Sequence, residues 1–199
     1  MKKTMLLLGV LMLSAAAAYA QESRQDVSLS GTAILGPTIH GADNVQQSMT
    51  GAAGALLSYR YMLTPRSALE MNYSWGQDQQ KYFVNNFSYR IHSRQQEISA
   101  AYVYSMTFKR YNPFAELGVG TMIFTPILDN KTLQLNTKSV KGVGGLGGAG
   151  LAYELSPSWD IRMEYRAFLT KTPSFGQDNL KTNRYEIISM PSVGVAFHF

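Results

Sequence analysis

Apolar and polar residues alternate with a period of two over much of this chain, most clearly across residues 159–170. One set of alternate positions holds Trp159, Ile161, Met163, Tyr165, Ala167 and Leu169, and the other holds Asp160, Arg162, Glu164 and Arg166. Because successive side chains of a β-strand point to opposite faces, this pattern predicts a strand with one apolar and one charged face. A helix would spread both sets around its circumference.

Seven further segments show the same alternation with less contrast. They lie near residues 27–30, 57–61, 69–75, 97–106, 115–123, 140–155 and 192–199, of which 140–155 is rich in glycine. Segments of about ten residues with this alternation are typical of transmembrane β-strands. The pattern therefore predicts eight strands.

The predicted connections alternate strictly between long and short. The long ones are residues 36–49, 78–93, 126–137 and 171–183, and the short ones are residues 63–66, 108–113 and 155–158. An up-and-down transmembrane barrel has short periplasmic turns and longer outer loops, whereas a Greek-key sandwich has no reason to sort its loops in this way. The order predicts an even number of strands and both chain ends in the periplasm.

Backbone hydrogen bonding predicts that this sheet is closed. Inside hydrocarbon every N–H and C=O group needs a partner, and an open sheet would leave two edges unpaired. We therefore expect an all-β fold: an eight-stranded antiparallel up-and-down transmembrane β-barrel. The alternative fold is a soluble lipocalin-like barrel, which would place its apolar residues inside and its polar residues outside.

The first twenty residues have the features of a cleaved export signal. Lys2 and Lys3 precede an apolar stretch from Met5 to Leu13, and an Ala-Tyr-Ala sequence ends at Ala20. Signal peptidase accepts this pattern of small residues, and the apolar stretch is too short for a permanent membrane helix. We expect residues 1–20 to be a signal peptide and residues 21–199 to form one barrel domain.

Composition excludes several classes of function. Without Lys2 and Lys3 the chain has 16 basic and 13 acidic residues, a net charge of +3, which gives no indication of a nucleic-acid partner. The chain has no cysteine, so neither disulfides nor thiol chemistry contribute. The overall hydropathy is slightly negative, as expected when only alternate residues face lipid.

Aromatic residues cluster near the predicted strand ends, where they would anchor a barrel at the membrane interface. On the short-turn side these are Tyr59, Tyr61, Tyr102, Tyr104, Phe114, Tyr153, Trp159 and Phe197. On the long-loop side the candidates are Trp75 and Phe124.

Three stretches of sequence carry a resemblance to a known family. They are the run Pro-Phe-Ala-Glu-Leu-Gly-Val-Gly at residues 113–120, residues 147–166, and the alternating C-terminal residues 193–199. The chain resembles the small outer-membrane β-barrel family that includes the OmpA transmembrane domain, OmpX and the opacity-type proteins. The resemblance implies a location in the bacterial outer membrane. It also implies that Val195, Phe197 and Phe199 form a signal read by the barrel-assembly machinery.

Eight charged residues occupy the alternate strand positions that face away from the lipid, so their side chains should project into the lumen. They are Arg60, Glu70, Glu97, Glu116, Asp160, Arg162, Glu164 and Arg166. An eight-stranded barrel is only just wide enough for its interior side chains, and isolated buried charges are costly, so we expect the arginines and carboxylates to pair. Such a network is a plug that fills the barrel. The alternative is a gated path for ions or small solutes, formed when the pairs rearrange.

Catalytic and cofactor sites are not expected. The glycine-rich run 142–147 formally matches a dinucleotide fingerprint, but an alternating strand follows it where a helix is required. A lipid A-modifying enzyme is the enzymatic alternative, and it would need a histidine near a serine and an acid on the outer wall. The chain has only His40, His92 and His198, and none lies in such an arrangement. We therefore expect no enzyme, no cofactor and no metal site.

The predicted long loops are mildly basic. Their basic residues are Lys81, Arg90, Arg94, Lys131, Lys138, Lys171, Lys181 and Arg184, and their acidic residues are Asp43, Asp78, Asp129 and Asp178. Lysine and arginine bind phosphate, so lipopolysaccharide is an expected partner, and a solvated charged rim is the alternative. Residues 82–91 are unusually aromatic for a loop. Their alternating apolar residues occupy odd-numbered positions, whereas those from Ile98 onward occupy even-numbered positions. This change predicts a β-bulge near residues 92–95.

These observations favour a monomeric outer-membrane barrel with a structural or interaction role in envelope integrity or adhesion. Residues 78–93 and 126–137 would be the loops that contact a surface ligand. Within the first of them, residues 82–91 would form a protruding strand edge to which a partner can add a strand. A narrow channel and a lipid A-modifying enzyme are the two alternative functions.

Overall fold

The computed structural model describes residues 24–40, 46–84, 87–127, 138–176, 182 and 184–199. The signal-peptide prediction falls on residues 1–20, which lie outside the described residues, and it stays a prediction. No helix in the described part of the chain is long and apolar enough to cross a membrane.

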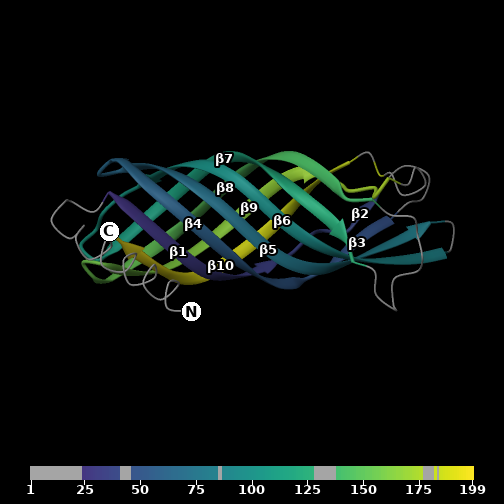
Figure 1. The fold of residues 1–199 in the computed structure, drawn as a ribbon, viewed down its shortest axis with the longest axis horizontal. Coiled ribbons are helices and arrows are strands. Elements are labelled where there is room, and N and C mark those ends of the chain that lie inside the picture. Colours follow the sequence, from purple (N-terminus) through teal and green to yellow (C-terminus); the bar gives the residue numbers. More distant parts are fainter. Residues whose placement is uncertain (1–23, 41–45, 85–86, 128–137, 177–181, 183) are drawn as a thin grey trace, which may run out of the picture.

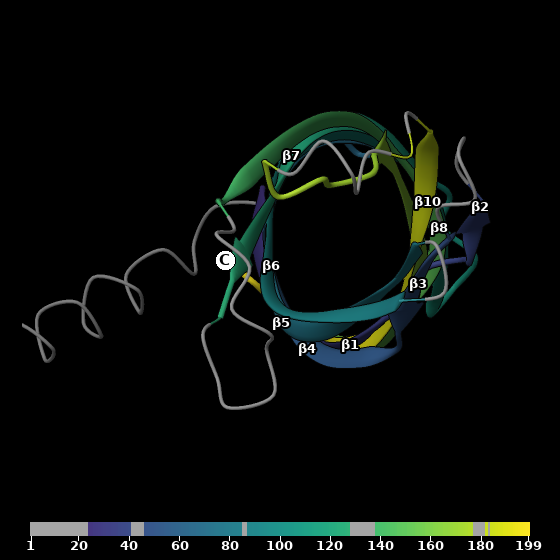
Figure 2. The same ribbon diagram turned by 90° about the vertical axis from the view of Figure 1, so that its right-hand side faces the viewer.

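In the described residues, ten strands form a single antiparallel sheet. In chain order they are β1 (Gln25–Ile34), β2 (Ile39–His40), β3 (Gln46–Thr50), β4 (Ala52–Thr64), β5 (Ser67–Val84), β6 (Phe87–Ser105), β7 (Tyr111–Pro126), β8 (Val140–Ser156), β9 (Trp159–Lys171) and β10 (Tyr185–His198). Eight of them, β1 and β4 to β10, close into a ring through the β1–β10 and β5–β6 pairings. The ring is visible when the molecule is viewed along its long axis (Figure 2). The predicted eight-stranded barrel is confirmed.

The wall has the polarity that a membrane requires. In β9, Met163 and Tyr165 are about half exposed on the outside, whereas Arg162 and Glu164 between them are buried on the inside. Val195 in β10 also faces outward. This arrangement excludes the lipocalin-like alternative, because a soluble barrel would reverse it.

The two ends of the barrel differ. At one end, here named the turn end, short connections join β4 to β5 and β8 to β9, and Gln25 of β1 pairs with the backbone of Phe199. At the other end, here named the hairpin end, β5 and β6 pair without interruption up to Val84 and Phe87. This hairpin continues past the last β4–β5 pair, Gly54 with Gly76, and β3 and β2 pair alongside it (Figure 1).

The extended hairpin corrects two predictions. Residues 78–93 were expected to be a long loop, and most of them are strand. The β-bulge expected near residues 92–95 is absent, because the β5–β6 register is constant along the whole hairpin. The change of parity has another cause: Tyr82 and Ile91 face the interior, which is apolar at this end.

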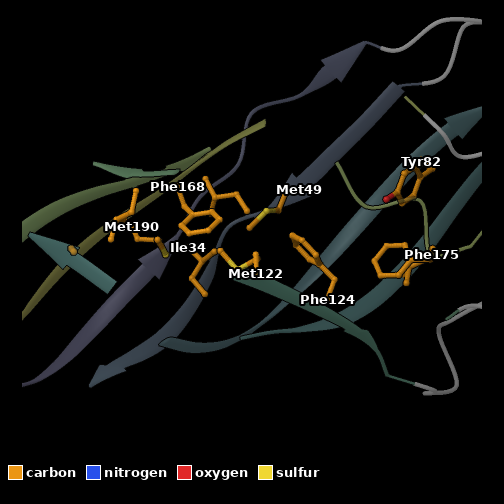
Figure 3. Packing of buried hydrophobic residues seen from close by; sticks show 12 residues of the cluster. Ile34, Met49, Tyr82, Met122, Phe124, Phe168, Phe175 and Met190 are labelled. Carbon is orange, nitrogen blue, oxygen red and sulfur yellow. The ribbon is translucent and has the colours of Figure 1, made fainter. Parts of the chain in front are cut away.

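The interior is filled by two layers of different chemistry. The turn-end half contains the buried arginines and the carboxylates that pair with them, here named the charged layer. The hairpin-end half contains a buried apolar cluster, which is shown in Figure 3. The cluster comprises Ile34, Met49, Tyr82, Ile91, Ala101, Met122, Phe124, Leu146, Phe168, Phe175, Ile188 and Met190. Two residues predicted for the interfacial girdles, Phe114 and Phe124, are therefore misassigned: both are buried inside the barrel.

The contact between the first and last strands contains an irregularity. Pairing of β1 with β10 stops at Thr32 and Ser192 and resumes as a single bridge between Leu35 and Ser189. Pro191 lies in the gap and has no N–H group to donate across it. The Thr32 hydroxyl lies 3.2 Å from the Pro191 carbonyl oxygen and 3.3 Å from that of Ala33. A hollow of about 820 Å³ covers this seam on the outer wall.

Candidate functional site

The charged layer begins with a cross-strand pair near the turn end. Arg60 of β4 and Glu70 of β5 are direct neighbours in the sheet. The Arg60 Nε atom donates to Glu70 Oε2 over 2.7 Å, and both residues are almost fully buried. Since side chains opposite each other on antiparallel strands lie within reach, the β4–β5 register alone positions this pair.

Arg162 links three strands that are distant in sequence. From β9 its Nη2 atom lies 3.0 Å from Asp26 Oδ1 of β1, and its Nη1 atom lies 3.7 Å from Glu70 Oε2 of β5. Nη1 also donates to the Ser28 hydroxyl. The sequence analysis did not single out Asp26, although Asp26 alternates with the apolar Val27 and Leu29 and so has lumen parity.

Arg166, four residues further along β9 on the same face, forms the second centre. Its Nη2 atom lies 2.5 Å from Glu97 Oε1 of β6, and its Nε atom lies 3.2 Å from Glu116 Oε1 of β7. The hydroxyl groups of Ser74 and Ser99 donate to the two oxygens of Glu97. Arg162 and Arg166 together therefore tie β9 to β1, β5, β6 and β7 across the bore.

The ring of Phe114 fills the space beside the arginines. The guanidinium carbon of Arg60 lies 4.8 Å from the ring centroid, and that of Arg162 lies 5.8 Å from it. A cation over an aromatic face is attracted by the ring quadrupole. This contact explains why Phe114 lies in the lumen and not in the interfacial girdle where the sequence placed it.

Within the described part of the chain, two of the eight predicted lumen residues have no arginine within ion-pairing distance. Asp160 lies near the turn end with its Oδ2 atom 2.9 Å from His198 Nε2. Glu164 accepts a hydrogen bond from the Ser192 hydroxyl. All eight residues are buried on the inner face, and the remaining six form the Arg60–Glu70–Arg162 and Arg166–Glu97–Glu116 groups.

Glycines in β8 leave room for this network. A Cβ atom on Gly148 would collide with the Glu116 carboxylate, and one on Gly150 would collide with the Phe114 ring. Both glycines lie on the inner face next to β7. Glycine occurs inside strands where a neighbouring group approaches the backbone closely.

The apolar layer is closed at the hairpin end by a segment that turns into the bore. Phe175 is fully buried, and its ring meets that of Tyr82 edge-on with centroids 6.4 Å apart (Figure 3). The Tyr82 hydroxyl donates to the carbonyl of Pro173 over 2.8 Å. Phe175 and Gly176 have φ angles of 50° and 78°, a left-handed turn that is uncommon for a bulky residue.

Comparison with known proteins places the barrel in a family. The chain matches the outer membrane protein β-barrel domain over residues 5–199. The chain belongs to this family. A search of curated protein sequences gives no match.

Solved structures similar to this outer membrane β-barrel are small barrels of the same kind. OprG from Pseudomonas aeruginosa has a TM-score of 0.68 at 13% identity, covering 88% of this chain and 95% of that one. Neisserial surface protein A has a TM-score of 0.63 at 13% identity, covering 89% and 98%. The outer membrane protein AlkL has a TM-score of 0.61 at 16% identity, covering 90% and 91%. At these identities the similarity establishes the fold alone.

The other residues singled out from the sequence lie at the ends of the β-barrel domain. Phe197 packs on Trp159 and Phe199, with ring centroids 4.9 and 6.1 Å apart, while Val195 faces outward in the same strand. His40 is on β2, His92 contacts the Gln79 amide, and His198 is at the turn end. Among the described residues no three His, Cys, Asp or Glu side chains are grouped as a metal site. The predicted loop 126–137 lies almost wholly outside the described residues.

Proposed function

We propose that this outer-membrane barrel does not conduct and acts through its structure and surface contacts, in envelope integrity or attachment. The observation that carries the proposal is the filling of the bore by two successive layers. A path for ions would have to pass first through the paired charges and then through the buried apolar cluster.

The charged layer acts as an internal brace. Arg162 and Arg166 each contact carboxylates from two other strands, so the network ties opposite parts of the wall together. Replacing such pairs with apolar residues is often neutral, but removing a single partner leaves an uncompensated buried charge and costs about 3–5 kcal/mol. The layer therefore fits a structural role in which all of its members are retained.

The surface role would belong to the hairpin end. We place this end outside the cell and the turn end, with both chain ends, in the periplasm, because short turns are typical of the periplasmic side. Arg90 and Arg94 lie on the exposed face of the β5–β6 hairpin. Guanidinium groups bind phosphate in a bidentate manner, so lipopolysaccharide is the partner these residues fit.

Planar-bilayer recording of the purified, refolded barrel tests the proposal. Wild-type protein should show no conductance steps at any voltage. Arg162→Ala combined with Phe175→Ala opens both layers and should produce steps, whereas the exposed control Arg94→Ala should remain silent. A reproducible wild-type conductance would overturn the proposal.

One observation favours a gated channel as the second candidate. Arg162 has two carboxylate partners, Asp26 at 3.0 Å and Glu70 at 3.7 Å, so a shift between them would move a charge without leaving it unpaired. Voltage-dependent steps in the wild-type recordings would favour this candidate.

We further infer that the protein is not an enzyme. The inference is supported by the position of His198, which pairs with Asp160 on the inner side, and by the contact of His92 with Gln79. Neither arrangement presents a nucleophile and base to lipid. Mass analysis of lipid A from cells that overproduce the protein tests this inference: the lipid A should be unchanged, and a lost or added acyl chain would contradict it.

A further inference from the structure

The pairing of β8 with β9 stops before either strand ends at the hairpin end. In the described residues the last pair on this side is Gly145 with Leu169. β8 nevertheless extends to Val140 and stays paired with β7 up to that residue, and β9 extends to Lys171 and stays paired with β10. The wall is therefore split between the two strands beyond Gly145 and Leu169, and this opening is here named the β8–β9 split.

A small pocket lies in the β8–β9 split. Its volume is about 170 Å³, and it is lined by Val140, Lys141, Gly142, Lys171, Thr172, Ser174 and Thr182. Past the pocket the two chain segments meet again, because the Lys138 N–H donates to the Phe175 carbonyl over 3.0 Å. One water occupies about 30 Å³ of the liquid, and sites for drug-sized ligands begin at about 300 Å³. The pocket therefore has room for a single small polyatomic group.

The lining of the pocket is positively charged. Lys141 comes from β8 and Lys171 from β9, so each of the two separated strands carries a lysine at the split. None of the described residues that line the pocket is acidic. Glu186, the acid on the adjoining part of β10, is buried on the inner face and is not among them. An anion is therefore the kind of ligand that this lining attracts.

Hydrogen-bond donors accompany the two lysines. The half-buried Ser174 contributes a hydroxyl group. Thr172 donates its hydroxyl to the Arg184 carbonyl over 3.0 Å and contacts the Thr182 hydroxyl, which fixes the side of the pocket next to β10. The edges of β8 and β9 that face each other across the split have no ladder partner, so their N–H groups require another acceptor. Ammonium, hydroxyl and backbone N–H groups around one small space are donors suited to the oxygens of a phosphate group.

The pocket lies at the border of the apolar outer wall. Val143 of β8 and Leu169 of β9 are exposed apolar residues on the outer face. The next outward residues towards the hairpin end are Lys141 and Lys171. Tyr185, the exposed cross-strand neighbour of Lys171, is of a type enriched where hydrocarbon meets the head groups. The two lysines therefore lie at the level of lipid head groups.

We propose that the β8–β9 split binds the phosphate group of an outer-leaflet lipid of the lipid A class. Lysine binds phosphate as a point charge, and the pocket has room for this group while the acyl chains lie along the apolar wall. A free phosphate has the same chemistry, but the level of the site at the membrane border supports a lipid. The inference rests on the proposed placement of the hairpin end outside the cell. It deepens the proposed lipopolysaccharide contact by naming a second site, separate from Arg90 and Arg94.

Isothermal titration of lipid A into the refolded barrel in lipopolysaccharide-free detergent, with and without the phosphate groups of the lipid, tests the site. Wild-type protein should bind phosphorylated lipid A at least roughly tenfold more tightly than the dephosphorylated form. Lys141→Gln combined with Lys171→Gln should lose this preference. Arg90→Gln combined with Arg94→Gln removes the same charge from the same end, so it is the matched control and should keep the preference. Ser174→Ala, which changes no charge, should weaken binding of the phosphorylated form about fivefold.

Inorganic phosphate alone distinguishes the two sources of the ligand. It should bind wild-type protein at least roughly tenfold more weakly than lipid A does, because it has no acyl chains to contact the wall, and equal affinity would overturn the lipid as the source. Equal binding of both lipid A forms by wild type, or an unchanged preference in the lysine variant, would overturn the site. Loss of the preference in the arginine variant alone would also overturn it, and would leave the proposed lipopolysaccharide contact of Arg90 and Arg94 standing. Heat-modifiable migration on a denaturing gel establishes that each variant folds, and none of these outcomes affects the conductance result.

Discussion

At the residue scale, the lumen network shows which contacts parity can predict. Alternation alone gave the inward direction of all eight predicted charges, because the side-chain period of a strand is two. It could not give their partners, since Arg162 meets Asp26 and Glu70 only through the tilt and closure of the ring. Aromatic residues were the least predictable: Phe114 is equally suited to an interface and to a stack against arginines.

Removal of Arg162 should destabilise the barrel strongly. Arg162→Ala leaves Asp26 without its ion-pair partner and Glu70 with one fewer, at a cost of about 3–5 kcal/mol. The urea midpoint of unfolding, followed by gel mobility without boiling, should fall accordingly. Arg94→Ala removes an exposed arginine and is the control; a midpoint for Arg162→Ala equal to that of the control would refute a structural role for the network.

The inner-face glycines of β8 should not tolerate a side chain. Gly150→Val would overlap the Phe114 ring and the backbone of β9, and overpacking of this kind costs about 1–3 kcal/mol. Gly145 has nothing within 4 Å of an added Cβ, so Gly145→Ala should leave stability unchanged. Urea unfolding of the two variants compares them directly, and equal midpoints would show that Gly150 is not required for packing.

At the element scale, the hairpin of β5 and β6 marks the limit of the sequence pattern. The alternation between an apolar outer and a polar inner face identifies a strand only where the lumen is polar. From Gln77 to Lys81 both faces of β5 are polar, because the buried Asp78 and Gln80 alternate with Gln77, Gln79 and Lys81 on the outer face. The contrast therefore disappears, and the extended strands were taken for a loop. The connection lengths at the turn end carried no such ambiguity, and those short connections were predicted correctly.

The segment that closes the hairpin end should depend on Tyr82. Tyr82→Phe removes the hydrogen bond to Pro173 and costs about 1 kcal/mol. Hydrogen exchange measured by mass spectrometry should then increase in residues 172–176 while the turn end stays protected. Tyr73→Phe removes an exposed hydroxyl that accepts from Gln96 and serves as the control. Unchanged exchange in residues 172–176 would show that the segment does not depend on the Tyr82 hydrogen bond.

At the scale of the whole molecule, a closed ring with an apolar outer wall determines how the protein behaves in solution. The apolar residues of β9 and β10 are about half exposed, which only lipid or detergent can cover. The sequence predicted this architecture because closure and outward apolarity both follow from the membrane as solvent. It could not predict the change from a charged to an apolar interior, which depends on the level at which side chains from different strands meet.

The refolded protein should migrate faster on a denaturing gel without boiling than after boiling, since the hydrogen-bonded ring resists the detergent until heated. The mature chain should also require detergent or lipid to stay in solution. A single mobility before and after boiling, together with solubility in plain buffer, would contradict the membrane barrel.

The interruption of the β1–β10 pairing at Pro191 makes this contact weaker than the others around the barrel. Five of its eight neighbour contacts keep a constant register, and those of β4–β5 and β8–β9 shift only next to their turns. The eighth contact, between the two terminal strands, is interrupted and relies in part on one threonine hydroxyl. On heating, β1 and β10 should therefore separate before any other pair of neighbouring strands. A circular permutant, in which the native ends are joined and the chain is opened elsewhere, should still open first between β1 and β10. The interruption is caused by Pro191 and not by the position of the chain ends.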